Sequence, residues 1–301
     1  MKLTILGCHS ATPRINTNPT SQVLEIKNHM FLIDCGEGTQ VELRRNRIKF
    51  SRIKHIFISH LHGDHYFGLI GLISTFQLLT RETELHIYGP KGLKDIILLQ
   101  LKLSESWTSY NLIFHELNSK ASELIFEDDS VSVYTIPLKH RIYTNGFLFK
   151  EKSNERKLDI KAVEEANIDM AYFRKLKQGA DVFNEDGVLI KNQSVTKDPQ
   201  LPKSYAYCSD TEYTESIIQL IEKVTVLYHE STFLDKNENL CKKTKHSTAR
   251  QAAIIARKAD VQCLILGHFS TRYNNYDDFK NQAKEEFNSV LLAEDGKKFQ
   301  F

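Results

Sequence analysis

The sequence lacks any cysteine pair spaced for metal binding or for redox chemistry. Its five cysteines, at positions 8, 35, 208, 241 and 263, are scattered along 301 residues, and none belongs to a Cys-x-x-Cys pair. This distribution argues against a disulfide framework and against a zinc site made of thiolates.

Long apolar runs and a strong charge imbalance are also missing. No stretch approaches the ~18 apolar residues that a membrane span requires, and residues 1–10 have too short an apolar core for a signal peptide. The formal net charge is only +2, so contacts with nucleic acid would need a local basic patch. The hydrophobic content of 41% and charged content of 26% are ordinary for a globular protein. We therefore expect a soluble, cytoplasmic chain with no membrane contact, made of one large domain or two smaller ones.

One short stretch, by contrast, is rich in metal-ligand side chains. The apolar run Ile56–Ile58 predicts a buried strand, and it is followed at once by His60-Leu61-His62-Gly63-Asp64-His65. Imidazole nitrogens and carboxylate oxygens suit zinc and its neighbours. Four such side chains from one tight loop can hardly converge on a single ion. The spacing therefore favours two ions roughly 3.5–4 Å apart that share the loop.

Three further residues of the same chemical type follow other strand-like runs. His140 ends the run Leu138-Lys139-His140, Asp210 follows the predicted strand Tyr205–Cys208, and His268 follows Cys263–Leu266. In an α/β sheet, residues just beyond strand ends gather at one rim, where sites form. Each residue alone is a weak signal, but together with the histidine loop they predict a two-metal site.

The remaining pattern alternates between strands and helices, which indicates an α/β protein. A helix is predicted over Tyr66–Leu79, after the histidine loop, and no short repeat is visible. Between about Lys150 and Lys203 the chain is charged and lacks a strong period, so we interpret it as an inserted segment, with a plain solvated linker as the alternative. The other predicted elements are strands at Lys2–Gly7, Gln22–Ile26, Met30–Asp34, Leu85–Tyr88, Leu112–Glu116, Val131–Ile136 and Val224–His229, and helices at Val41–Arg45, Leu93–Leu103 and Thr248–Ala259.

Several motifs together give the sequence a family resemblance over nearly its whole length. It resembles the metallo-β-lactamase-fold hydrolases and, more closely, the tRNA 3′-processing endonucleases called RNase Z. The His-x-His-x-Asp-His loop specifies only the superfamily, whereas the stretches at 34–40 and 229–232, with His246 in its setting, narrow the resemblance to RNase Z. The motifs are Asp34-Cys35-Gly36-Glu37-Gly38-Thr39-Gln40, residues 59–65, Pro137-Leu138-Lys139-His140-Arg141, Ser209-Asp210-Thr211, His229-Glu230-Ser231-Thr232, residues 246–250 and Gly267-His268-Phe269-Ser270.

The resemblance implies a four-layer αββα sandwich with two zinc ions at one rim of its sheets. By this analogy, His60, His62 and His140 would hold one ion, and Asp64, His65 and His268 the other, with Asp210 bridging both. Asp34 would orient a ligand histidine. The ions would activate a water molecule and neutralise the scissile phosphate. Asp64 would accept a proton from that water, and His246, supported by Glu230, would protonate the leaving 3′-oxygen.

The same resemblance gives a role to the inserted segment. RNase Z enzymes have a protruding arm that grips precursor tRNA, and residues 150–203 lie at its place within a single domain of residues 1–301. Arg174, Lys175 and Lys177 suit sequence-independent contacts with phosphate. Where the family has a turn rich in Gly and Pro, this sequence has residues 168–173. The family is typically a homodimer in which the arm of one subunit serves the active site of the other.

Two other functions stay open at this point. The first is a general zinc phosphodiesterase, or another small-ester hydrolase of the fold, which would have the same metal site but a different substrate. The second is a non-catalytic RNA-binding protein with the same fold and no active metal site. A degenerate site usually loses ligands, however, and all seven predicted metal ligands are present here. Imidazole and carboxylate also suit manganese, iron and cobalt, so the ligand types alone do not specify zinc.

Overall fold

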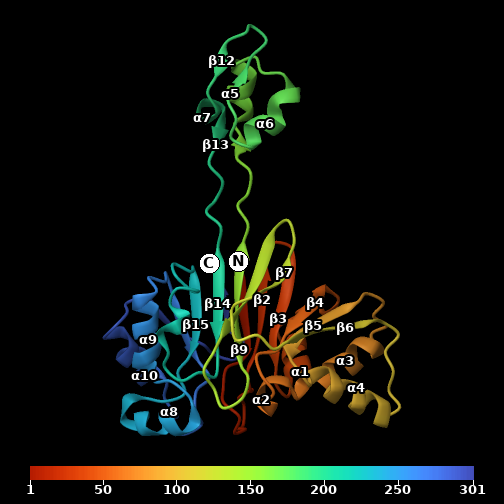
Figure 1. Ribbon diagram of the computed structural model, residues 1–301, viewed down its shortest axis with the longest axis vertical. Helices are drawn as coiled ribbons and strands as arrows, with labels where there is room; N and C mark the ends of the chain where they lie inside the picture. The colour runs from red at the N-terminus through yellow and green to blue at the C-terminus, as the bar shows by residue number, and fades with distance from the viewer.

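Runs of β-branched and aromatic residues form two seven-stranded sheets in the computed structural model, which describes residues 1–301 (Figure 1). Each sheet is mixed, with parallel strands from β3 to β6 in the first and from β14 to β17 in the second. In spatial order the first sheet contains β18 (Lys298–Gln300), β1 (Lys2–Gly7), β2 (Ser21–Ile26), β3 (His29–Cys35), β4 (Ile53–Phe57), β5 (Leu85–Pro90) and β6 (Leu112–Leu117). The second contains β17 (Val290–Leu292), β16 (Leu264–Gly267), β15 (Val226–Glu230), β14 (Ser204–Cys208), β9 (Asn145–Glu151), β8 (Val131–Pro137) and β7 (Leu124–Glu127).

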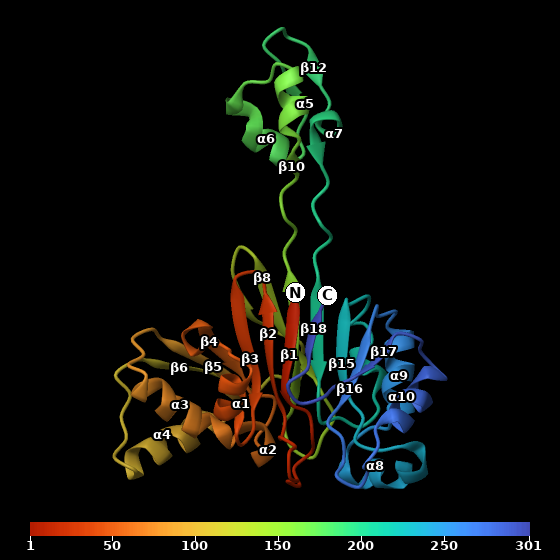
Figure 2. The ribbon, with the colours of Figure 1, turned by 180° about the vertical axis from the view of Figure 1, so that it is seen from behind.

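Helices cover the outer face of each sheet, as Figures 1 and 2 show from opposite sides. A cluster of 46 buried residues fills the space between the sheets and continues under the helices of the second, while a cluster of 20 joins the first sheet to its own helices. The predicted αββα sandwich is therefore confirmed. The helices of the first sheet are α1 (Thr39–Arg45), α3 (Gly68–Leu78) and α4 (Leu93–Leu103); those of the second are α9 (Ala249–Lys258) and α10 (Asp277–Lys284). Two shorter helices, α2 (Gly63–Tyr66) and α8 (Glu238–Thr244), lie at the lower rim in Figure 1.

The inserted segment stands away from the sandwich as a separate lobe between β9 and β14 (Figures 1 and 2). Five buried side chains form a small core of its own: Val163, Ile168, Leu176, Val182 and Val195. We call residues 152–203 the arm. Its elements are β10 (Lys157–Leu158), α5 (Ile160–Glu165), η2 (Met170–Tyr172), α6 (Phe173–Lys177), β11 (Val182–Phe183), β12 (Leu189–Ile190), α7 (Asn192–Val195) and β13 (Thr196–Lys197).

Strand direction places the arm and the histidine loop at opposite ends of the sandwich. β9 starts beside the histidine loop, where the Asn145 N–H donates to the Ser59 carbonyl at 3.1 Å, and runs toward the arm. The antiparallel partner β14 starts at the arm and ends just before Asp210. The arm therefore projects away from the end of the molecule that carries the predicted metal ligands (Figure 1).

Most predicted elements form, with ends that differ by one to three residues, but the predicted helix Tyr66–Leu79 is divided. α2 begins already at Gly63, and a break at Phe67 separates it from α3. The start of α3 packs closely on the Asp34–Gly36 loop: a Cβ at Gly68 would lie 2.0 Å from the Gly36 carbonyl oxygen.

The remaining short elements are the 3₁₀ turns η1 (Phe50–Arg52), η3 (Glu215–Ile217) and η4 (Asp235–Asn237). None of the helices has the length and apolar character required to cross a membrane.

Candidate metal centre

The four ligand-type residues of the histidine loop are held at the end of β4. His60, Asp64 and His65 are buried, and His62 is half-buried at the mouth of a cavity. The loop turns into α2 at Gly63, so Asp64 and His65 lie in the first turn of a helix. This sharp change from strand to helix brings side chains six positions apart to a common point.

His140, Asp210 and His268 reach the same point from the second sheet, after β8, β14 and β16. Asp210 and His268 have left-handed backbones, with φ of 61° and 57°, and Asp34 in the first sheet has φ of 54°. Non-glycine residues adopt this conformation uncommonly, and it concentrates at functional sites. The rim predicted from strand ends thus brings together all seven residues.

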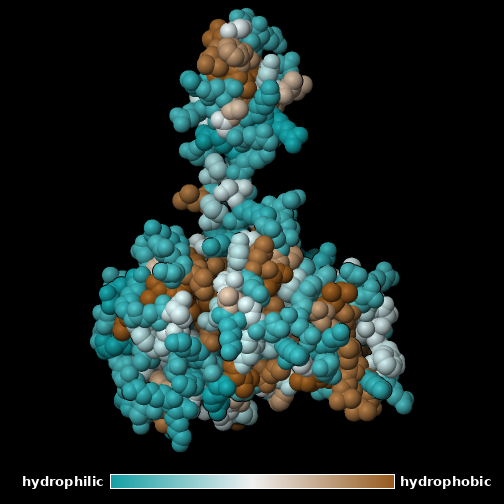
Figure 3. Space-filling model, in the orientation of Figure 1, coloured by the Kyte–Doolittle hydropathy of each residue, from teal (hydrophilic) through white to brown (hydrophobic).

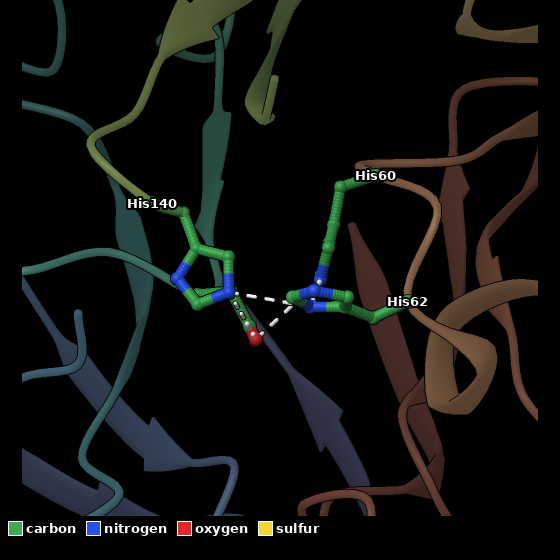
Figure 4. A group of neighbouring side chains, drawn as sticks. His60, His62 and His140 are labelled. Carbon is green, nitrogen blue, oxygen red and sulfur yellow. Dashed lines mark hydrogen bonds and ion pairs between the residues drawn. The ribbon is translucent and has the colours of Figure 1, made fainter. Parts of the chain in front are cut away.

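The first group of donor atoms comprises His60, His62, His140 and Asp210, all within 4.8 Å of one another. His60 Nε2 and His140 Nε2 lie 2.9 Å and 3.2 Å from His62 Nδ1. Figure 4 shows the three imidazoles pointing toward one another from the histidine loop and the loop after β8. Asp210 Oδ2 lies 3.5 Å from His60 Nε2 and 3.6 Å from His140 Nε2. Such spacing is typical of ligands that surround one ion.

The second group comprises Asp64, His65 and His268, and it faces the other oxygen of Asp210. Asp210 Oδ1 lies 3.2 Å from His65 Nε2 and 3.0 Å from His268 Nε2. Asp64 Oδ2 lies 3.4 Å and 3.6 Å from the same two nitrogens. Asp210 therefore directs one carboxylate oxygen toward each group, which is the geometry required of a bridging ligand.

The buried nitrogens of this centre fit a metal ion. His65 Nε2 and His268 Nε2 are buried and have no hydrogen-bond partner in the protein, a situation that costs free energy unless something fills it. The opposite nitrogens are occupied: His65 Nδ1 contacts Asp34 Oδ2 at 2.7 Å, His268 Nδ1 contacts Thr232 Oγ at 3.0 Å, and His140 Nδ1 donates to the Lys245 carbonyl at 2.9 Å. These contacts fix the rings and direct each Nε2 inward. The donor set is compatible with divalent metal binding.

Asp34 anchors the histidine loop from below. Its carboxylate accepts hydrogen bonds from the Ser59 N–H at 2.7 Å, the Ser59 hydroxyl at 2.9 Å and the Tyr207 hydroxyl at 2.5 Å, besides its contact with His65. Asp34, Ser59 and Tyr207 are fully buried. The sequence indicated Asp34 through the family resemblance but gave no signal for Tyr207, because that contact joins strands β3 and β14 of different sheets.

His246 lies beside both groups and is paired with Glu230. Its Nδ1 contacts Glu230 Oε1 at 2.8 Å, and its ring centre lies 5.2 Å from that of His140 and 5.3 Å from that of His268. Burial disfavours the imidazolium, but the charge and hydrogen bond of Glu230 outweigh burial and raise the pKa of His246 to about 9. Glu230 therefore favours the protonated form of His246, whose Nε2 is free of the Glu230 contact.

Glu230 is a fully buried carboxylate whose oxygens are surrounded by donors. Besides His246, they accept from the Thr211 N–H at 2.8 Å, the Thr232 hydroxyl at 2.6 Å and the Ser247 N–H at 3.1 Å. Burial raises the pKa of Glu230, but the charge and hydrogen bond of His246 dominate and lower it. Each partner thus favours the charged form of the other.

Curated relatives and a solved structure point to the same family. Ribonuclease Z of Parabacteroides distasonis is 45% identical over 294 residues, which are 98% of this chain and 97% of that protein. Ribonuclease Z of Bacteroides thetaiotaomicron is 45% identical over 292 residues, which are 97% and 92% of the two chains. The crystal structure of human tRNase Z, short form, aligns over 100% of this chain and 99% of that one, with a TM-score of 0.73 and 27% identity. This chain belongs to the ribonuclease Z family.

Two further matches bear on the scaffold. A family profile described as anti-Pycsar protein Apyc1 matches residues 1–153, which include the histidine loop and His140. A metallo-β-lactamase fold protein from Bacillus subtilis aligns over 99% of this chain with a TM-score of 0.69 and 17% identity. The predicted metallo-β-lactamase fold is therefore confirmed for this ribonuclease Z family member.

A cavity of about 460 Å³ opens directly over the ligand-type residues of this family member. Its lining includes His62, Asp64 and His246, together with three residues that sequence reasoning did not assign: Glu37, Phe67 and Arg141. Glu37 and Arg141 belong to the quoted motifs, and Phe67 lies two residues after His65, but a motif does not show which of its side chains face the cavity. The cavity gives a phosphodiester access to the donors.

The predicted arm residues Arg174, Lys175 and Lys177 lie on α6 of the arm, remote from this cavity (Figure 1). All three are exposed, while Leu176 between them packs into the arm core. Residues 168–173, in place of a turn rich in Gly and Pro, form the turn η2 and the start of α6. The structure thus separates the basic residues of the arm from the candidate metal centre of the same chain.

Proposed function

We propose that this chain is a zinc-dependent endoribonuclease that removes the 3′ trailer from precursor tRNA and leaves a 3′-hydroxyl on the tRNA. The relatives named ribonuclease Z and the human tRNase Z structure support this activity. The observation that carries the proposal is the convergence of seven ligand-type side chains beside a charged His246–Glu230 pair. A divalent-metal phosphodiesterase needs both a set of metal ligands and a general acid for the leaving oxygen.

Two zinc ions per chain fit the two groups of donors. His60, His62 and His140 would hold one ion, Asp64, His65 and His268 would hold the other, and Asp210 would bridge them. When bound, such ions lower the pKa of water and neutralise charge on the scissile phosphate.

The protein itself supplies the proton transfers. The pKa of Asp64 is lowered, because the charge of His65 and hydrogen bonds from His268 and His65 outweigh the effect of burial. A deprotonated Asp64 can accept a proton from the attacking water. In-line attack on phosphorus breaks the P–O3′ bond, and His246 gives its Nε2 proton to the leaving 3′-oxygen. Glu230 keeps His246 charged before this step.

The arm would bind the tRNA away from the cleavage point. Exposed Arg174, Lys175 and Lys177 suit contacts with the phosphate backbone, which are independent of sequence. Leu176 of α6 packs into the separate core of the arm, which fixes the helix that carries these side chains. Recognition would then depend on the folded shape of the RNA more than on its bases.

A homodimer would bring an arm and a metal centre to one RNA molecule. The arm of this chain projects from the end opposite to its own metal centre (Figure 1), so it is better placed to serve a second subunit. α3 and α4 offer an apolar surface for pairing: Leu78 of α3 is 82% exposed and Leu103 of α4 75%, and Leu98 and Leu99 of α4 are exposed as well. Figure 3 shows hydrophobic side chains gathered at the lower right, over these helices. Exposed apolar patches of this kind mark interfaces.

Cleavage of a 3′-extended precursor tRNA, with the cut mapped, tests the activity. The proposal predicts a cut just after the discriminator base by the wild-type protein and none by Asp64→Ala. A small diester, bis(p-nitrophenyl) phosphate, is the second substrate. Hydrolysis of the diester without cleavage of precursor tRNA would favour a general phosphodiesterase instead. Binding of tRNA with neither activity by the zinc-loaded protein would indicate a non-catalytic RNA-binding protein.

A further inference from the structure

A second concentration of positive charge lies outside the arm, between the end of α1 and the start of β4. Six cations occur in the eleven positions 44–54, and no acidic residue occurs between Glu42 and Asp64. We call residues 44–54 the basic segment. In a chain whose net charge is only +2, this is a strong local imbalance. Its cations are Arg44, Arg45, Arg47, Lys49, Arg52 and Lys54.

Most of these cations have no carboxylate partner. Arg45 pairs with Glu42 at 2.5 Å and Arg52 with Glu25 at 3.1 Å, whereas the other four are exposed with no carboxylate oxygen within 4.0 Å. Solvated protein surfaces usually mix both signs of charge. Four unpaired cations in one short segment therefore leave a surface suited to an anionic partner.

The basic segment is hollowed rather than flat. A cavity of about 800 Å³ between the ends of α1 and α3 is lined by Arg44, Arg47 and Lys49, with Glu82 as its one acidic side chain. The guanidinium of Arg44 lies over the Phe50 ring, 5.2 Å from its centre, which holds it at the cavity wall.

A second cavity continues this surface on the other side of Ser51, which lines both. It has a volume of about 520 Å³ and is lined by Arg52 and Lys54. Its one acidic residue, Asp128, is already paired with His29 at 2.7 Å. Exposed cations and hollows thus follow one another along the segment.

The position of the basic segment links it to the arm. The segment leads into β4 and includes its first two residues, and the other end of β4 leads to His60, so the segment lies at the end of the sandwich from which the arm projects. At roughly 3.3 Å per residue, β4 and its flanks separate the segment from the histidine loop by roughly 20 Å.

A contact at the base of the arm connects it to this surface. The Lys27 ammonium donates to the Asn154 side-chain oxygen at 2.9 Å. Lys27 belongs to the turn between β2 and β3, and the residues that follow it, Asn28 and His29, line the second cavity.

We infer that the basic segment is a second contact surface for the phosphate backbone of RNA, beside the arm. This inference rests on the proposed function, which supplies the polyanion. RNA gripped by the arm passes the arm's base, where the unpaired cations Arg47, Lys49 and Lys54 meet its phosphates. Because such contacts release counterions, they add affinity that falls as salt concentration rises.

Direct binding of fluorescently labelled precursor tRNA, measured by anisotropy over a range of salt concentrations, tests this surface without requiring cleavage. The test variant is R47Q/K49Q/K54Q, and the control is K120Q/K280Q/K284Q, which loses the same charge from other parts of the surface where these lysines also lack ion pairs. The test variant should bind about tenfold more weakly at low salt. Its slope of log affinity against log salt should be shallower by roughly 2 to 3.

Equal affinity and slope in the two triple variants would overturn the inference. So would loss of AMP binding in the test variant with unchanged RNA affinity, because the segment would then be a site for small anions. Hydrolysis of bis(p-nitrophenyl) phosphate should be unchanged in both variants, which separates the contact surface from the metal centre. If the wild-type protein binds precursor tRNA but does not cleave it, the proposed activity fails while the binding comparison still decides this inference.

Discussion

Glu230→Gln is the sharpest perturbation of the proposed general acid. Burial lowers the pKa of His246, but the charge and hydrogen bond of Glu230, together with a smaller effect of Asp210, raise it from 6.5 to about 9. The net difference is worth roughly 3 kcal/mol between the two protonation states. The substitution removes the negative charge and keeps the size of the side chain. It should therefore return the pKa of His246 toward its ordinary value. Because the pKa of His246 is raised in the wild-type protein, the acid is available at low pH and is lost as pH rises through about 9.

The expected loss of activity depends on pH. With a pKa of about 9, about 90% of His246 is protonated at pH 8; with a pKa of 6.5 the fraction is about 3%, roughly a thirtyfold reduction. At pH 6 the two fractions differ by less than about twofold. The assay is kcat/KM for precursor tRNA between pH 5.5 and 9.5. Metal ions held by His140 and His268 would lower the pKa of His246 in both proteins, so the displacement of the alkaline limb is the quantity to compare.

Two controls make this result decisive. Glu37→Gln removes the same charge from an exposed position on the same cavity and should leave the alkaline limb in place. The glutamine amide at position 230 faces five donor contacts that the carboxylate accepted, so thermal unfolding must show that the variant is folded at the assay temperature. An alkaline limb at the same pH in wild-type and Glu230→Gln proteins would refute the role assigned to the pair.

Three further predictions concern the hydrogen bond from Tyr207 to Asp34, the arm and the proposed dimer interface. Tyr207→Phe removes a buried hydrogen bond to Asp34 and should lower the free energy of unfolding by about 1–3 kcal/mol and zinc affinity by at least about tenfold; unchanged thermal stability and zinc binding would contradict this. Lys175→Gln with Lys177→Gln should raise KM for precursor tRNA by about tenfold without altering kcat for bis(p-nitrophenyl) phosphate, and equal effects on both substrates would contradict the arm's role. Leu99→Glu should convert a dimer to monomers in sedimentation velocity, whereas a monomeric wild-type protein would refute the proposed interface.

The sequence was most informative where chemistry follows the end of a strand. His60, Asp210 and His268 could be placed at one rim because each follows a short apolar run, and the ends of parallel strands meet at one edge. Helix Leu93–Leu103 and strand Lys2–Gly7 form with the predicted bounds. In such elements, a strong local pattern bounded by turn residues determines both the type of the element and where it begins and ends.

Long-range contacts were not predictable in the same way. The hydrogen bond from Tyr207 to Asp34 joins two sheets, and no local pattern relates residues 173 positions apart. Short edge strands such as β17 and β18 were missed because three residues carry no period. The break at Phe67 depends on how closely Gly68 approaches the Asp34–Gly36 loop, which only tertiary packing determines. The divided helix and the support of Asp34 therefore required the structure.

Titration of the metal-free protein with zinc, followed by cleavage of precursor tRNA, tests the two-metal account most directly. The account predicts no cleavage without metal, a rise that saturates at two equivalents per chain, and products with a 3′-hydroxyl and a 5′-phosphate. Asp210→Asn, which weakens the carboxylate shared by both groups, should not reach wild-type activity at two equivalents. Full cleavage by the metal-free protein, or saturation at one equivalent, would contradict the account.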